Sequence, residues 1–231
     1  MSNPRELMAR LNPQTIKYDI GRGGVSELTN QDIAAALAFV PAGLGREVLE
    51  ACWWPDGAAL RRNSLRDAVY ARVRVEFERQ GEMLSEARTH RGMIHACANW
   101  SHAPTAELRR EMQAADARLE SAKARCWPPS AWDMLPVIVR AVIAEIAQPN
   151  QCHACMGRGQ RVIEELVVMC APCSGRGVVP ISDRKRAESI GRDESTYRST
   201  WRPMYEWLML VMQDAEQEAA RQMGEALRSA T

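Results

Sequence analysis

The chain of 231 residues lacks any apolar run long enough to cross a bilayer, which requires roughly 18 consecutive apolar residues. Its most apolar stretch, residues 134–146, is interrupted by Pro136, Arg140 and Glu145. The first residues, MSNPRELMARLNPQ, contain no apolar segment of the kind that directs export. We therefore expect a protein of the cytoplasm.

Signatures of catalysis are also missing from the sequence. It contains no glycine-rich phosphate loop, no paired-carboxylate motif and no serine–histidine–aspartate grouping. His90, His95 and His102 have no nucleophile or carboxylate at a spacing that suggests a shared site. The sequence thus indicates a protein that is not an enzyme.

Lysine is scarce, since only Lys17, Lys123 and Lys185 occur among 30 basic residues and the others are arginines. Arginine makes better bidentate contacts with phosphate, carboxylate and guanine, although a GC-rich coding sequence would produce the same bias. The formal net charge is +1, so the chain as a whole does not attract nucleic acid. Any nucleic-acid contact must come from a local basic face.

Most of the chain has helical periodicity, which predicts a mainly α fold. We expect a mobile arm over residues 1–28, a helical bundle over 29–149, a cysteine module over 150–180, and a helix-turn-helix with a long last helix over 181–231. Within the bundle, capping and breaking residues predict helices over 29–40, 44–53, 60–98, 105–125 and 131–147. Gly81 and Gly92 are candidate breaks in the longest of these.

The strings CHACMGRG and CAPCSGRG, which are ten residues apart, contain two C-x-x-C pairs. Their four thiolates have the number and pairing that tetrahedral Zn²⁺ requires, with each sulfur about 2.3 Å from the ion. The following glycines permit positive φ where the backbone turns around the metal, and the segment between the pairs fits a short β-hairpin. We predict one structural zinc ion with these ligands: Cys152, Cys155, Cys170 and Cys173.

Other interpretations of the cysteines are weaker. Thioredoxin-like redox chemistry needs a C-x-x-C at the end of a strand in a βαβ unit, and no such unit is visible. A catalytic zinc needs one open coordination position, but four thiolates would occupy all four positions of a tetrahedral ion. His153 could replace a thiolate, but an exposed position in the first knuckle is the simpler expectation. For the remaining cysteines, Cys52, Cys97 and Cys126, apolar neighbours predict core packing.

A helix-turn-helix is predicted after the cysteine module. Ser182 and Asp183 fit the start of a short helix that Gly191 ends, and a second helix begins near Glu194. Tyr197, Trp201, Met204, Leu208, Val211 and Met212 form the apolar face of the second helix. Pro203 removes a backbone hydrogen bond inside this helix, so we expect a kink there.

The polar face of this motif has residue types that read DNA in the major groove. The residues predicted to contact bases or to lie beside them are Glu194, Ser195, Arg198, Ser199 and Arg202. Those predicted to contact phosphates are Arg184, Lys185 and Arg186. Between residues 176 and 202 there are seven basic and four acidic residues, a modest basic surplus. Two amphipathic helices joined by a glycine also occur in proteins that bind no DNA, so ordinary packing remains the alternative.

Together, the duplicated C-x-x-C-x-G-x-G and the segment TYRSTWRPMYEWL resemble the Q family of late-gene antitermination proteins of lambdoid phages. Thr196, Thr200, Pro203 and Tyr205 match the pattern of that family, which has lysine at the position of Arg202 and aspartate at that of Glu206. The resemblance covers residues 150–220 well, residues 28–53 faintly and the middle helices poorly. The cysteine motif alone is shared with the DnaJ co-chaperones, which carry four such repeats and an HPD tripeptide that is missing here.

The resemblance implies a specific function in the cytoplasm of a bacterial host. A protein of this family binds a double-stranded DNA element in the phage late promoter and meets RNA polymerase with its sigma factor at a promoter-proximal pause. It loads onto the polymerase, which then reads through terminators with the help of a host elongation factor. Two other classes stay open: a DNA-binding repressor or activator that never travels with polymerase, and a DnaJ-like zinc module that binds peptides.

Overall fold

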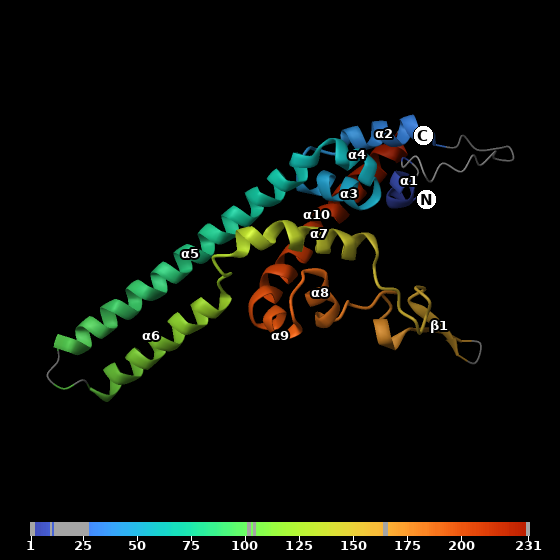
Figure 1. The fold of residues 1–231 in the computed structure, drawn as a ribbon. Coiled ribbons are helices and arrows are strands. Elements are labelled where there is room, and N and C mark those ends of the chain that lie inside the picture. Colours follow the sequence, from blue (N-terminus) through green and yellow to red (C-terminus); the bar gives the residue numbers. More distant parts are fainter. Residues whose placement is uncertain are drawn as a thin grey trace. The chain divides into compact units, whose positions relative to one another are not determined.

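The computed structural model describes residues 3–9, 11, 28–100, 103, 105–163 and 166–229 of the chain (Figure 1). These residues are mainly helical, and they include a small antiparallel sheet of two strands. The chain divides into two compact units. The first comprises Met1–Ala68 with Asp133–Thr231, and the second comprises Val69–Trp132.

The core of the first unit lies where three short helices, α1 (Pro4–Ala9), α2 (Asn30–Phe39) and α3 (Leu44–Trp53), pack on the long last helix, α10 (Arg202–Ser229). A fourth short helix, α4 (Pro55–Leu60), packs against α3. Met8, Ile33, Leu49 and Met223 are fully buried in this core. At Gly45, α3 approaches α10 so closely that a Cβ would overlap the Ala215 carbonyl oxygen.

The predicted start of α2 is confirmed in detail. The Thr29 hydroxyl accepts a hydrogen bond from the Asp32 N–H at 3.2 Å, and the Asp32 carboxylate accepts one from the Thr29 N–H at 2.8 Å. This capping box satisfies backbone N–H groups that the first turn of a helix leaves without partners. Local capping residues therefore determine where α2 begins.

Helix α1 corrects the prediction of a mobile arm over residues 1–28. Leu7 and Met8 are buried in the core, and the Arg5 guanidinium donates two hydrogen bonds to the nearly inaccessible carboxylate of Glu216. A helix of six residues is unstable alone, so its stability comes from these tertiary contacts, which the local sequence does not reveal. Residues 12–27, the rest of the predicted arm, lie outside the described residues.

The second unit is an antiparallel helical hairpin formed by most of α5 (Arg62–Trp100) and by α6 (Ala106–Arg125). The predicted breaks at Gly81 and Gly92 are wrong, because α5 runs through both. A glycine costs a helix only about 1 kcal/mol, and packing of Ala87 against Leu119 and Ala122 offsets this cost. At the other end of the unit, Phe77 packs against Trp127 and Trp132.

Helix α7 (Ala131–Ala147) leads from the hairpin into the cysteine module. The module contains β1 (Gln160–Ile163), β2 (Leu166–Met169) and a short 3-10 turn, η2 (Ala171–Cys173). The strands are antiparallel, and Arg161 lies opposite Val168. The predicted hairpin is confirmed. Among the described residues, no helix is both long and apolar enough to cross a membrane.

Two helices follow the module, as predicted. Helix α8 (Asp183–Ser189) begins at Ser182, whose hydroxyl accepts the Lys185 N–H, and the chain reverses at Gly191, where φ is 67°. Helix α9 (Glu194–Thr196) begins at its cap Asp193 and continues through the π-helical turn η3 (Tyr197–Trp201) into α10.

The π-helical turn lies directly before Pro203, where the sequence predicts a kink. The Arg202 N–H donates to the carbonyl of Tyr197, five residues earlier, instead of the usual four. Proline cannot donate a hydrogen bond, so the wider turn accommodates the interruption immediately before Pro203. The helix continues past it to Ser229.

The compact units differ from the four predicted segments. The C-terminal helix α10 packs on α1, α2 and α3, so the predicted division between residues 29–149 and 181–231 does not separate two cores. The compact helical hairpin, in contrast, lies within a segment that the sequence analysis treated as one domain.

Candidate functional site

Four cysteine sulfurs form a cluster that can hold a metal ion. The Sγ atoms of Cys152, Cys155, Cys170 and Cys173 all lie within 4.8 Å of one another, and all four residues are buried. The Sγ atoms of Cys152 and Cys170 are 3.8 Å apart, and those of Cys155 and Cys173 are 3.7 Å apart. A tetrahedron with Zn–S bonds of about 2.3 Å has edges of about 3.8 Å. These separations fit a metal and are far too long for disulfide bonds, which are about 2.05 Å.

The two halves of the module repeat each other around the cluster. The Gly159 N–H donates to the Cys155 Sγ at 3.3 Å, and the Gly177 N–H donates to the Cys173 Sγ at 3.3 Å. A Cβ at Gly159 would overlap the carbonyl oxygen of Gly175. All four motif glycines have positive φ, as the sequence predicted. The backbone thus supplies hydrogen bonds to sulfur and brings the two knuckles together.

Without a metal, the thiols of the cluster differ in acidity. Burial, followed by hydrogen bonding with neighbouring thiols, raises the pKa of Cys170 to about 12. Burial also acts to raise the pKa of Cys173, but the Gly177 N–H and the neighbouring thiols outweigh it and lower that pKa to about 7. Binding of a divalent cation requires deprotonated thiols, so it must release protons from the cluster.

His153 and the cysteines outside the two C-x-x-C pairs do not belong to the metal cluster. His153 is exposed and does not belong to the group of four sulfurs. Cys52 is buried, as predicted, and burial followed by the nearby Glu216 charge raises its pKa to about 12. Cys97 is exposed, so the prediction of core packing is wrong there, because its side chain lies on the outer side of α5.

The residues predicted to read DNA are gathered on one face. Ser195, Arg198, Ser199 and Arg202 are exposed, and Glu194 is half-buried. Glu194, Ser195, Arg198 and Ser199 line a shallow hollow. The opposite side of this helical run packs inward through Tyr197, Trp201 and Met204, which are buried as predicted. The sequence pattern therefore predicted correctly which side chains of this helical run are buried and which are exposed.

Carboxylates accompany the arginines of this face. Arg198 Nη2 lies 2.5 Å from Glu194 Oε1, and its Nε donates to Asp183 at 3.0 Å. Arg202 donates to Glu206 at 2.8 Å. The guanidinium groups are thus partly neutralised, and phosphate would have to replace these partners.

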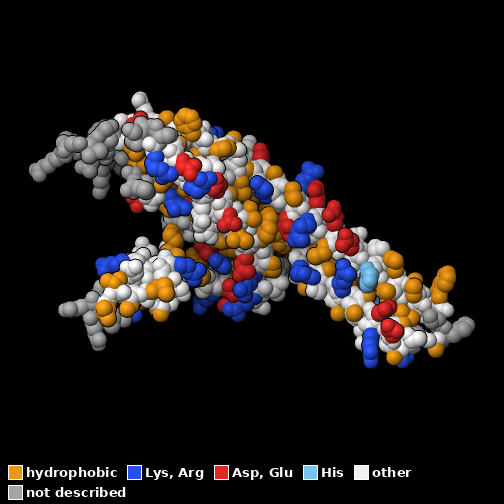
Figure 2. All heavy atoms as spheres, turned by 180° about the vertical axis from the view of Figure 1, so that it is seen from behind, with side chains coloured by type: hydrophobic (Ala, Val, Ile, Leu, Met, Phe, Trp, Pro, Cys, Tyr) orange, Lys and Arg blue, Asp and Glu red, His pale blue; other side chains and the backbone are white. Residues whose placement is uncertain are grey.

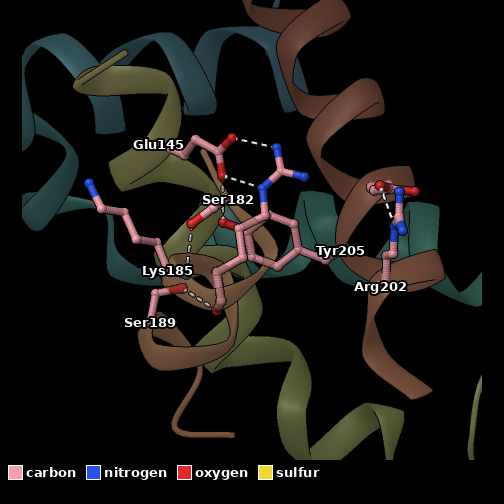
Figure 3. A network of polar contacts seen from close by, with 8 residues as sticks. Glu145, Ser182, Lys185, Ser189, Arg202 and Tyr205 are labelled. Atoms are coloured by element: carbon pink, nitrogen blue, oxygen red, sulfur yellow. Dashed lines mark hydrogen bonds and ion pairs between the residues drawn. The ribbon is translucent and has the colours of Figure 1, made fainter. Parts of the chain in front are cut away.

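Arg186 is removed from the predicted phosphate contacts. Its guanidinium makes two hydrogen bonds with Glu145, at 3.0 and 2.5 Å, and both side chains are only 12% exposed. The Tyr205 hydroxyl donates to the same carboxylate at 2.8 Å, and the Arg186 guanidinium carbon lies 5.1 Å from the centre of the Tyr205 ring. Burial and then the Glu145 charge raise the pKa of Tyr205. Arg186 on α8 therefore connects α7 and α10 through Glu145 and Tyr205, and Figure 3 shows these last two side chains together in the network.

The other two predicted phosphate contacts remain accessible. Arg184 is exposed and pairs with Glu188 at 3.0 Å on its own helix. Lys185 is exposed, and in Figure 3 its ammonium group points away from the network while its backbone N–H bonds to Ser182. Within the described part of the chain, no carboxylate pairs with the ammonium group of Lys185.

The sequence alone does not reveal the partners in this network. Glu145 precedes Arg186 by 41 positions and Tyr205 by 60, so no periodicity or spacing connects them. The one signal in the sequence is that Tyr205 directly follows Met204 and so lies beside the apolar face of the helix. This position indicates that the Tyr205 ring is buried, but it does not identify a partner.

Comparison with protein-family models, with curated proteins and with solved structures finds no match to this chain.

Proposed function

We propose that this chain is a zinc-stabilised protein that binds double-stranded DNA and regulates transcription. Zinc is the ion that best fits the cysteine cluster. Four thiolates favour a soft or borderline cation, and the sulfur separations correspond to a tetrahedron. With four sulfur ligands no position is open for a substrate, so the ion would have a structural role.

The observation that carries the DNA-binding proposal is the exposed face at the start of the helical run after Gly191. Ser195, Arg198 and Ser199 lie on its first turns, which is where a recognition helix contacts base edges. Helix α8 precedes it across a short turn, and Lys185, which is exposed, would contact phosphate. We interpret α8 and α9 with the start of α10 as a helix-turn-helix.

The carboxylates on this face do not prevent DNA binding. Exposed ion pairs stabilise a protein by only about 0–1 kcal/mol each, so a guanidinium can exchange its partner at low cost. A bidentate contact between arginine and guanine contributes about 1–3 kcal/mol of discrimination between bases. The carboxylates would also weaken binding to arbitrary sequences, which favours specific over non-specific contacts.

The finer proposal is late-gene antitermination, as the resemblance to the Q family implies. The chain would bind an element in a promoter, load onto paused bacterial RNA polymerase with its sigma factor and let it pass terminators with a host elongation factor. This proposal is supported by the two knuckles followed by helices with Thr196, Thr200, Pro203 and Tyr205. The alternative is a DNA-binding regulator that does not travel with polymerase.

A selection from random duplexes tests DNA binding directly. The zinc-loaded chain should enrich one sequence, and Arg198→Ala should weaken binding to it by about 1–3 kcal/mol and relax the preference at one base pair. Lys185→Ala should weaken binding to selected and scrambled duplexes alike. If no sequence is enriched, or if both variants act equally on both duplexes, this face does not read DNA.

A further inference from the structure

The second strand of the cysteine module exposes apolar side chains on both of its faces. Leu166, Val167 and Met169 are 68%, 65% and 70% exposed, and Met156 on the first knuckle is 72% exposed. In Figure 2, orange side chains gather together with blue ones on this module, at the lower left. Exposed apolar patches of this kind mark sites of interaction on soluble proteins.

The outer edge of β2 is also unprotected. The described sheet has two strands, so β2 pairs with β1 on one side only. The Cys170 N–H donates to the Gly159 carbonyl at 2.9 Å, and bonded pairs alternate along an antiparallel ladder. By this alternation the Arg161–Val168 pair is bonded, and the N–H and C=O groups of Val167 and Met169 face outward. The strand LVVM has none of the charges or prolines that usually block such an edge.

The cysteine module also carries exposed positive charge. Arg158, Arg161 and Arg176 are exposed, and Arg161 lies opposite Val168 on the neighbouring strand. Between residues 150 and 180 the sequence has these three arginines and two glutamates, Glu164 and Glu165, which it places between the strands. Among the described residues, no carboxylate pairs with Arg158 or Arg161, whereas Arg198 and Arg202 each have a carboxylate partner.

Other occupants fit this surface less well. Single-stranded nucleic acid stacks its bases on aromatic rings, and residues 150–180 contain no Phe, Tyr or Trp. Insertion into a membrane would have to bury Glu164 and Glu165, which the sequence places between the strands, at a cost of roughly 2.5 kcal/mol or more each. Pairing with a second copy through strands of four residues would bury far less than the roughly 1,200 Å² of a stable interface.

We propose that β2 binds an extended segment of a partner protein in which apolar and acidic residues alternate. The segment would add a third strand at the outer edge of β2, with its backbone bonded to Val167 and Met169. Its apolar side chains would cover Leu166 or Val167, and its carboxylates would meet Arg158 and Arg161. This proposal does not depend on DNA binding, because it uses only the cysteine module.

A displayed library of random short peptides, selected on the metal-loaded full chain, tests this surface. We expect enriched peptides in which apolar residues alternate with Asp or Glu. Their binding should slow amide exchange at Val167 and Met169. Val167→Glu should weaken binding by about tenfold or more, whereas Leu210→Glu, a change at an exposed leucine of α10, should leave it unchanged. Retention of the metal by both variants shows that the module remains folded.

Arg161→Glu gives a second readout that a folding defect would not imitate, because it should turn the selection from acidic toward basic peptides. The proposal is overturned if the enriched peptides show no acidic alternation, or if Val167→Glu and Leu210→Glu bind them equally well. It is also overturned if sedimentation shows a dimer that Val167→Glu dissociates, since a second copy would then be the occupant.

Discussion

Asp183 accepts a hydrogen bond from the Nε of Arg198 at 3.0 Å and so connects the first turn of α8 to the helical run that follows Gly191. The same carboxylate lies 3.6 Å from Arg202. The Asp183 side chain is 20% exposed, whereas that of Arg198 is 58% exposed. One partly shielded carboxylate therefore holds two arginines of the proposed DNA-reading face.

Asp183→Asn should strengthen binding to duplex DNA by about three- to tenfold, because it removes a negative charge that competes with DNA for both guanidinium groups. Fluorescence anisotropy with the selected duplex measures the change. Asp214→Asn is the matched control, since it removes the same charge from an exposed position on α10. Equal effects of the two substitutions would show that Asp183 acts only through net charge.

Removal of the metal should unfold the cysteine module and leave the helical core. Structural zinc contributes about 10–16 kcal/mol of apparent binding free energy in small modules, and without it the module has little apolar core. We expect one zinc ion per chain, none after Cys155→Ser, and loss of amide protection only over residues 150–180. Elemental analysis that finds no zinc or two ions per chain would contradict this assignment.

The buried ion pair of Arg186 with Glu145 should be important for stability. Arg186→Met leaves the Glu145 carboxylate buried with only Tyr205 as partner, so the free energy of unfolding should fall by about 2–4 kcal/mol. Arg184→Met on the same helix is the control, because its exposed pair contributes about 0–1 kcal/mol. Denaturant unfolding of the two variants compares them, and equal losses would show that the network does not stabilise the fold.

The cap of α9 should weaken in acid. Hydrogen bonds from Thr196, through its side chain and then its backbone N–H, lower the pKa of Asp193. Its contribution to stability is therefore complete above the unfolded pKa of about 3.9, and it is lost as the pH falls through the lower folded pKa. The protection of the Thr196 amide, measured as the ratio of its intrinsic to its observed exchange rate, should fall over this range in the wild-type chain. In Asp193→Asn it should show no such dependence; an identical pH profile in both proteins would exclude this titration.

The sequence predicted what depends on near neighbours. The cysteine spacing, the caps Thr29 and Ser182, and the alternation of buried and exposed residues after Gly191 act within a few positions, and the structure confirms them. Helix α1 and the Arg186–Glu145 pair depend on contacts across 41 or more positions, which no local pattern encodes. The breaks predicted at Gly81 and Gly92 do not occur because the low helix propensity of glycine costs less free energy than the packing of α5 on α6 contributes.

Transcription through an intrinsic terminator by purified bacterial RNA polymerase tests the proposed function most directly. Binding to DNA beside a paused polymerase raises the local concentration of the chain, often to about millimolar for a short tether, so a surface of moderate affinity can load there. We expect the zinc-loaded chain to increase readthrough only on templates that carry its selected DNA element upstream. Arg198→Ala should abolish the increase. Arg221→Ala, at an exposed arginine of α10 about six turns after Arg198, should retain it. Unchanged readthrough in the presence of the chain, or an equal increase without the element, would contradict antitermination.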